Sequence, residues 1–241
     1  ELGLFDPHWK LSQPVPTLSK SRYDFVITPW DQIPDRACET RRMEVYAAMV
    51  DSMDQGIGRV LNALDRAGVA NNTLVMFLSD NGGCAGSADH GDAELPGGIN
   101  TFDYVAQGWG WAQNAPFRRY KTWTHEGGIS TPMIARWPGF TQPGSLTHQV
   151  GHVVDFMPTL LDITGAAYPE KRNGVVVLPT DGLTLLPVLE GRERAGHKSL
   201  CWYLYGNRAV RQGKWKLVWG DNTRQWELFD LESDRTETDD L

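Results

Sequence analysis

A run of five apolar residues, Leu74 to Leu78, restricts the possible folds more than any other feature of the chain. The run does not alternate with polar residues, which is typical of a strand covered on both faces, as in a parallel sheet between helices. The preceding residues 41–67 repeat apolar side chains at steps of three and four, and Gly68 follows. This pattern predicts a long helix that ends near Gly68. A helix, a turn and a buried strand in this order indicate an α/β protein.

Further segments extend the predicted α/β domain. Residues 129–137 form a second apolar stretch closed by Pro138-Gly139, so we expect a second buried strand there. Residues 155–163 and 182–189 are predicted to form short helices. Residues 82–120 are rich in glycine and polar side chains and are predicted to form a long loop.

The two ends of the chain differ from this middle part. Residues 1–40 are rich in proline and polar residues, which predicts an extended arm. After residue 195, short aromatic and β-branched pieces alternate with Gly and Asn turns, at 200–205, 209–211, 215–218 and 227–231. This pattern is typical of an antiparallel meander. We therefore expect an arm over 1–40, an α/β domain over 41–195 and a small antiparallel β subdomain over 196–241.

The composition excludes several classes of protein. The net charge of −7 argues against a nucleic-acid groove, which needs clustered Lys and Arg. No apolar run approaches the ~18 residues of a membrane span. The first residues show no basic region before an apolar core, so no signal peptide is visible and the compartment stays open. The three cysteines are widely spaced without a Cys-x-x-Cys pair, so a zinc ribbon is not expected.

Asp80 and Asn81 follow the predicted strand 74–78 directly. Open α/β sheets place their ligands at the carboxyl ends of the strands. A carboxylate and an amide oxygen are suitable ligands for a hard cation such as calcium or magnesium. Asp-Asn-Gly is also common turn chemistry, so the residues alone leave a plain turn as the alternative.

Lys121 follows two arginines and precedes the stretch Thr122 to Gly128. A lysine in a cationic, glycine-rich segment is suited to bind an oxygen of sulfate or phosphate. The alternative is a solvated basic loop. His125 lies in the same segment and is a candidate substrate-binding residue, although a lone histidine is more often structural.

Four stretches of the chain share the residues and spacing of one enzyme family. They are Tyr46–Val50 with Phe77–Gly82, Tyr120–Lys121 with Glu126–Gly128, Asp155–Asp162, and Gly206–Arg211 with Trp215–Val218 and Glu227–Leu231. In these stretches the chain resembles the type I sulfatases (arylsulfatases) of the alkaline phosphatase superfamily, over about residues 41–241. The resemblance implies an alkaline-phosphatase-like mixed sheet flanked by helices, followed by a small antiparallel β subdomain.

The resemblance also implies roles for the candidate residues. Asp80 and Asn81 match two ligands of a divalent cation, usually calcium, with magnesium as an alternative. Four residues separate Lys121 from Glu126-Gly127-Gly128, the spacing of the family's sulfate-binding lysine; no role for His125 carries over. The family hydrolyses sulfate monoesters with a formylglycine made from a Cys/Ser-x-Pro-x-Arg motif, while the metal and cations stabilise charge on the sulfate oxygens.

One departure from the family concerns the nucleophile. None of Cys38, Cys84 and Cys201 lies in a Cys/Ser-x-Pro-x-Arg motif, and the family's amino-terminal Asp-Asp ligands are absent. We therefore expect this chain to be the carboxy-terminal part of a longer sulfuric ester hydrolase, with a truncated β subdomain. The formylglycine would lie upstream of it, and the chain alone would be inactive. The substrate would be a small-molecule or carbohydrate sulfate ester. The alternatives are a phosphate or phosphonate ester hydrolase of the same superfamily, and a non-catalytic binding fragment.

Overall fold

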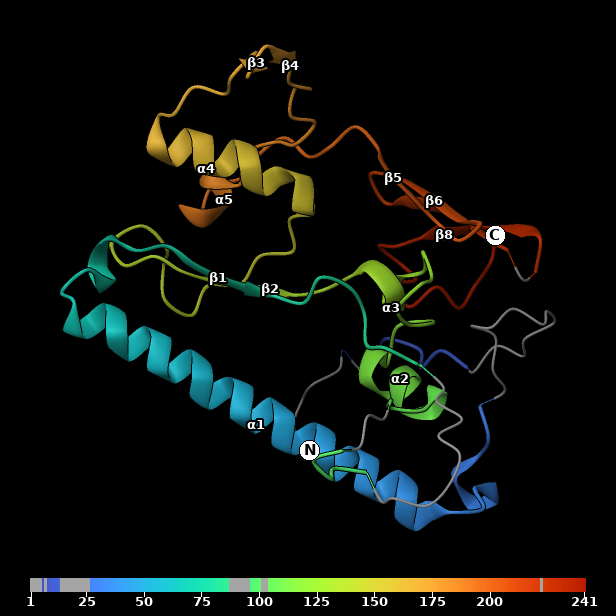
Figure 1. The fold of residues 1–241 in the computed structure, drawn as a ribbon. Coiled ribbons are helices and arrows are strands. Elements are labelled where there is room, and N and C mark those ends of the chain that lie inside the picture. Colours follow the sequence, from blue (N-terminus) through green and yellow to red (C-terminus); the bar gives the residue numbers. More distant parts are fainter. Residues whose placement is uncertain (1–5, 7, 14–26, 87–95, 101–103, 222) are drawn as a thin grey trace. The chain divides into compact units, whose positions relative to one another are not determined.

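The computed structural model describes residues 6, 8–13, 27–86, 96–100, 104–221 and 223–241, shown in colour in Figure 1. They belong to two compact units. The first comprises residues 1–60, 78–132 and 199–241, and the second comprises residues 61–77 and 133–198. Residues 1–5, 7 and 14–26 of the predicted arm lie outside the described residues, and its last residues, 36–40, belong to the first helix.

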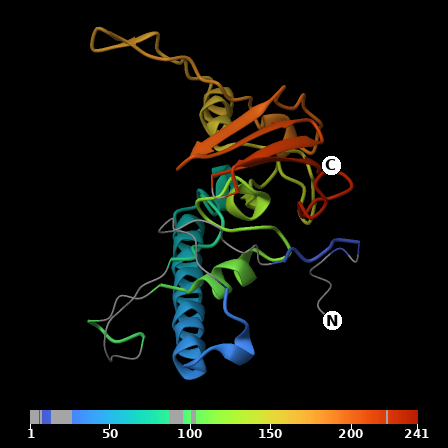
Figure 2. The same ribbon diagram turned by 90° about the vertical axis from the view of Figure 1, so that its right-hand side faces the viewer.

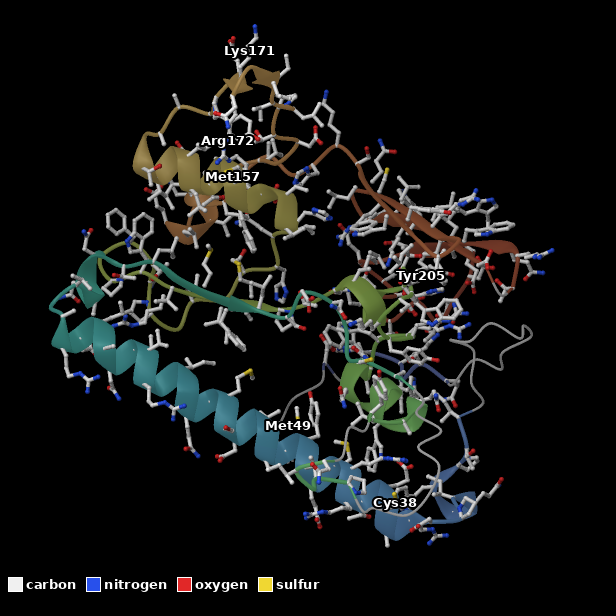
Figure 3. All side chains as sticks on the ribbon, in the orientation of Figure 1. Cys38, Met49, Met157, Lys171, Arg172 and Tyr205 are labelled. Atoms are coloured by element: carbon white, nitrogen blue, oxygen red, sulfur yellow. The ribbon has the colours of Figure 1, made fainter. Side chains whose placement is uncertain are left out.

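The predicted long helix is confirmed as α1 (Arg36–Arg66), which begins before residue 41. The earlier start has a local cause, because the carboxylate of Asp35 accepts a hydrogen bond of 2.9 Å from the backbone N–H of Cys38. The predicted apolar stripe is largely open, with Met49 64%, Met53 49% and Val60 61% exposed; Figure 3 labels Met49. Part of the stripe is covered, because Gly97 lies beside Val45, whose Cγ2 would be 2.7 Å from a Cβ added at Gly97.

A short sheet follows α1 and the 3-10 turn η2 (Ala70–Asn72). Strand β1 (Val75–Leu78) pairs with β2 (Met133–Arg136) in a two-stranded sheet (Figure 1). The position of the first predicted strand is confirmed, but the expectation that both of its faces are buried is wrong for the described residues, since Phe77 is 43% exposed. The second strand is shorter than the predicted 129–137.

Helix α4 (Phe156–Thr164) is the centre of the second unit and confirms the predicted helix at 155–163. The 3-10 turn η3 (Val153–Asp155) precedes it. After it come a hairpin, formed by β3 (Lys171–Arg172) and β4 (Val175–Val176), and the short helix α5 (Leu186–Leu189). The prediction of a helix over 182–189 was too long. The backbone N–H groups of Leu183 and Leu185 are bonded instead to Asp155 and Thr159, at 2.8 Å each.

Gly165 ends α4 in the left-handed conformation, with φ 67° and ψ 15°. We expect Gly165→Ala to lower the free energy of unfolding by about 1 kcal/mol, because a side chain is strained at positive φ. Gly58→Ala is the matched control, since an added Cβ meets nothing within 4 Å at either position and Gly58 lies inside α1. The control should raise the free energy of unfolding by about 0.5–1 kcal/mol. Urea unfolding midpoints measure both, and equal shifts would contradict the conformational argument.

The predicted carboxy-terminal meander is confirmed as a four-stranded antiparallel sheet. Its strands β5 (Leu200–Leu204), β6 (Asn207–Gln212), β7 (Trp215–Gly220) and β8 (Gln225–Asp230) pair in sequence order (Figures 1 and 2). The first turn has two consecutive positive φ angles, 50° at Tyr205 and 89° at Gly206, as a two-residue hairpin requires. The buried core of this sheet consists of Ala209, Val218, Phe229 and Leu231.

Two short helices complete the first unit. Helix α2 (Gln107–Asn114) lies in the stretch predicted as a continuous loop, and α3 (Glu126–Ile129) replaces the start of the predicted second strand. Both corrections matter below, because α2 and α3 flank the candidate site. Among the helices of the described residues, none is long and apolar enough to cross a membrane.

Candidate active site

The two candidate motifs are hydrogen-bonded to each other through their backbones. The N–H of Gly82 donates to the carbonyl of Gly128 at 3.0 Å, and the N–H of Lys121 donates to the carbonyl of Gly83 at 3.1 Å. Helix α2 fixes the same segment, because the side chain of Asn114 accepts a hydrogen bond of 2.9 Å from the N–H of Gly83. The segment that follows Asp80-Asn81 and the segment that begins at Lys121 are therefore one assembly.

Glycines allow the two segments to approach this closely. A Cβ added at Gly82 would lie 1.8 Å from the carbonyl oxygen of Gly127, and one added at Gly128 would lie 2.0 Å from that of Trp123. Both neighbours are backbone atoms. A side chain at Gly82 would push the two segments apart, and one at Gly128 would distort the segment that begins at Lys121. The close contact explains why glycine occupies these positions.

Asp80 and Asn81 fit part of a divalent-cation site. Asp80 is exposed and Asn81 is half-buried, and together they offer three hard oxygen atoms. Calcium takes about six to eight oxygen ligands. Within the described part of the chain, no group of three or more His, Cys, Asp or Glu side chains is placed to hold a metal. The pair is thus chemically suitable as part of a coordination shell, and the other ligands must come from outside this set.

Lys121 is exposed at the tip of a strained loop. The residues on either side of Tyr120-Lys121 have positive φ angles, 69° at Arg119 and 82° at Thr122. Non-glycine residues adopt such angles only when the surrounding structure holds them, and strain of this kind concentrates at functional sites. Arg119 also lies over the ring of Trp123, with the guanidinium carbon 4.2 Å from the ring centroid.

A buried ionic network joins this loop to the carboxy-terminal sheet, which we call the Lys216 network. The amino group of Lys216 lies 2.7 Å from Glu126 and 2.8 Å from Glu237. Glu237 accepts a hydrogen bond of 2.7 Å from the backbone N–H of Glu126, and Arg235 is paired with the other oxygen of Glu126. The exposed fractions are 0% for Lys216, 3% for Glu126 and 0% for Glu237.

The pKa values of the two carboxyl groups of this network are shifted in opposite directions. Burial raises the pKa of Glu126, but the charges of Lys216 and Arg235 outweigh it and hold this pKa at about 2. Burial, reinforced by the nearby carboxylate of Glu126, raises the pKa of Glu237. Glu126, the first residue of α3, is therefore ionised at neutral pH.

His125 is buried beside a second ion pair. Its ring is 1% exposed, and its Nε2 lies 3.3 Å from Glu227, which also accepts a hydrogen bond of 2.7 Å from Arg118. Burial, aided by the charges of Arg118 and Arg119, lowers the pKa of His125 to about 3 despite the Glu227 contact. The histidine is thus neutral at physiological pH. Contact with a substrate stays a prediction, and the burial of the ring offers no support for it.

The buried neutral state of His125 predicts acid lability. Its pKa is about 3 in the folded protein and 6.5 ordinarily, so the unfolded chain binds the proton first and stability falls as pH drops below 6.5. Glu227 and Glu126, with folded pKa values of about 2 against 4.5, lose their contribution only below pH 4.5. We expect wild type to lose about 2–3 kcal/mol more than His125→Gln between pH 6.5 and 4.5, at 1.36 kcal/mol per pKa unit. Urea unfolding across this range measures the difference, and parallel curves would refute it.

Sequence reasoning missed the residues that hold the loop in place. Lys216, Glu227, Glu126 and Asn207 enter the sequence analysis only as parts of shared motifs, and Arg235 and Glu237 have no role in it. One signal was available. Lys216 is two residues from the core residue Val218 on a strand, so it points to the same, inner face.

Comparison with known proteins shows the family of the chain. The family model described as sulfatase matches residues 2–166, and the model described as N-sulphoglucosamine sulphohydrolase, C-terminal, matches residues 117–241. An uncharacterized sulfatase of Schizosaccharomyces pombe is 32% identical over 240 residues, covering 88% of this chain and 42% of that protein. The N-acetylgalactosamine-6-sulfatase of Mus musculus is 32% identical over 186 residues, covering 76% of this chain and 31% of that protein.

A solved structure shows the same fold. A putative sulfatase from Bacteroides thetaiotaomicron superimposes with a TM-score of 0.57 at 20% identity, covering 96% of this chain and 48% of that one. The chain belongs to the sulfatase family of the alkaline phosphatase superfamily. It spans less than half the length of the relatives it matches.

Proposed function

We propose that this chain supplies the metal-binding pair and an anion-binding lysine of a sulfuric ester hydrolase. The observation that carries the proposal is the backbone bonding between the Asp80-Asn81 segment and the Lys121 segment, which unites a cation ligand pair and an exposed ammonium group in one assembly. The family membership supports sulfate monoesters as the substrate class.

Each residue has a proposed part in the reaction. Asp80 and Asn81 ligate a divalent cation, usually calcium in this family, that polarises the ester when bound. Lys121 binds an oxygen of the sulfate group and stabilises the negative charge that develops there. The pair β1 and β2 would be part of the alkaline-phosphatase-like mixed sheet of the family.

The nucleophile of the proposed reaction is not in this chain. No Cys/Ser-x-Pro-x-Arg motif occurs among its residues, so the formylglycine would lie elsewhere in the whole protein. Residues 1–241 alone are therefore proposed to be inactive. The name of the Mus musculus relative contains a sugar, and the name of the Schizosaccharomyces pombe relative contains no substrate. The proposed substrate is therefore a small-molecule or carbohydrate sulfate ester, without a particular compound.

The proposal is tested by turnover of 4-nitrophenyl sulfate and 4-nitrophenyl phosphate. The protein that contains this chain together with a formylglycine segment should hydrolyse the sulfate faster, lose activity with a chelator and regain it with Ca²⁺. Asp80→Ala should weaken Ca²⁺ binding measured by calorimetry. A faster rate on the phosphate would favour the phosphate or phosphonate hydrolase, and no turnover of either would favour a non-catalytic module.

A further inference from the structure

The loop that carries Lys121 is held from outside by the carboxy-terminal sheet. Strain at Arg119 and Thr122 would relax if the loop were free, because both residues prefer negative φ. The loop has bonds of its own: Trp123 N–H donates to the carbonyl of Tyr120 at 3.1 Å, and Gly127 N–H donates to the carbonyl of Arg118 at 2.9 Å. Side chains of the carboxy-terminal sheet add further contacts to these.

The first external contact is Asn207, at the start of β6. Its side-chain N–H donates to the carbonyl oxygen of the strained Thr122 at 3.1 Å, and its side-chain oxygen accepts a bond of 3.0 Å from the N–H of Asp221. Asn207 is 5% exposed, so both ends of its amide are used within the protein. The turn at Tyr205, which Figure 3 labels, directly precedes β6.

The second external contact is the Lys216 network. Glu126 is the first residue of α3 and follows the Lys121 loop closely in the chain. Its carboxylate is bonded to Lys216 and its backbone N–H to Glu237, so both the side chain and the main chain at this point are fixed by residues after 210. Arg235 adds a bond of 2.7 Å to Ser130, just beyond α3.

We propose that Asn207 and Lys216 are positioning residues for Lys121, through which the carboxy-terminal sheet holds the anion-binding loop in its strained, binding conformation. The inference rests on the proposed function of Lys121 as an oxyanion ligand. Asn207 fixes the carbonyl just after Lys121, and Lys216 fixes the helix that ends the loop. Neither residue needs to touch the substrate.

The test compares loop mobility with anion binding in matched variants. Asn207→Ala removes two neutral hydrogen bonds, to Thr122 and from Asp221. Lys216→Met removes a buried charge, with Lys216→Arg as the conservative variant. The controls are Gln212→Ala, at the exposed far end of β6, and Lys214→Met, whose ion pair with Asp230 is at the surface. Hydrogen exchange of the peptide covering residues 118–128 is measured on the chain. KM, kcat and inhibition by inorganic sulfate are measured on the formylglycine-containing protein.

Asn207→Ala should speed exchange in residues 118–128 and raise both KM and the inhibition constant for sulfate about tenfold, as expected for a displaced binding group. Exchange in α4 should not change, and Lys216→Arg should regain part of what Lys216→Met loses. The controls should match wild type. If Lys216→Met does not fold, Asn207→Ala decides the matter.

A folded Asn207→Ala variant with unchanged exchange and unchanged sulfate inhibition would overturn the inference. A wild-type protein that neither binds nor hydrolyses sulfate would instead refute the proposed function. In that case the exchange measurement still decides separately whether the sheet anchors the loop.

Discussion

Lys121→Ala is expected to lower kcat/KM for 4-nitrophenyl sulfate by about 10²–10³-fold, the usual cost of removing one stabiliser of developing negative charge. Lys121 is exposed and its loop is fixed by backbone contacts, so the truncation should remove the ammonium group and leave the fold intact. The measurement is steady-state kinetics on the formylglycine-containing protein.

Lys171→Ala is the matched control for this experiment. Lys171 is also an exposed lysine, but it lies in the β3–β4 hairpin (Figure 3). Its loss should leave kcat/KM unchanged. If Lys121→Ala stays within about threefold of wild type while hydrolysis is robust, Lys121 does not bind the sulfate group, and the anion site must be sought elsewhere.

Lys216→Met should destabilise the protein by about 3–5 kcal/mol, which is the typical cost of removing one partner from a buried ion pair. Methionine has nearly the shape of the lysine stem, so the loss comes from the charge rather than from a cavity. Glu126 and Glu237, both nearly fully buried, would then face each other without the intervening ammonium group. Urea unfolding at neutral pH measures the effect.

Two further variants separate charge from packing. Adding Glu126→Gln to Lys216→Met should recover part of the loss, because a neutral amide is less costly to bury without a cation. Lys214→Met removes a lysine two residues away whose ion pair with Asp230 is solvated, and its unfolding midpoint should not move. Equal destabilisation by Lys214→Met and Lys216→Met would contradict the claim that burial makes the ion pairs of Lys216 more important for stability.

Elements specified by short-range chemistry were predicted well. The stripe of α1, the glycine that ends α4 and the turns of the carboxy-terminal sheet all depend on neighbouring residues, and each lies where the sequence places it. The family motifs also placed Asp80, Asn81 and Lys121 in order along the chain. The roles of these three residues remain predictions.

Elements specified by distant contacts were predicted poorly. The sequence predicts no helix at residues 126–129 and begins a strand at residue 129. These residues form α3, where Glu126 is bonded to Lys216 and Gly128 lies close to the carbonyl oxygen of Trp123. The stretch at 182–185 looks helical, yet the N–H groups of Leu183 and Leu185 donate to side-chain oxygens of Asp155 and Thr159 instead of to the carbonyl groups of a helical turn. Local patterns cannot reveal partners that lie many residues away.

The Lys216 network can form only late in the synthesis of the chain. Lys121 is synthesised long before its loop's distant partners, which are Asn207, Lys216, Arg235 and finally Glu237. The nascent loop therefore emerges from the ribosome without any of these partners. A stop codon at any point between residues 207 and 237 would spare every motif from Asp80 to Gly128 and still deprive the loop of one or more of the side chains that hold it. Completion of the proposed anion site is in this sense coupled to completion of the polypeptide.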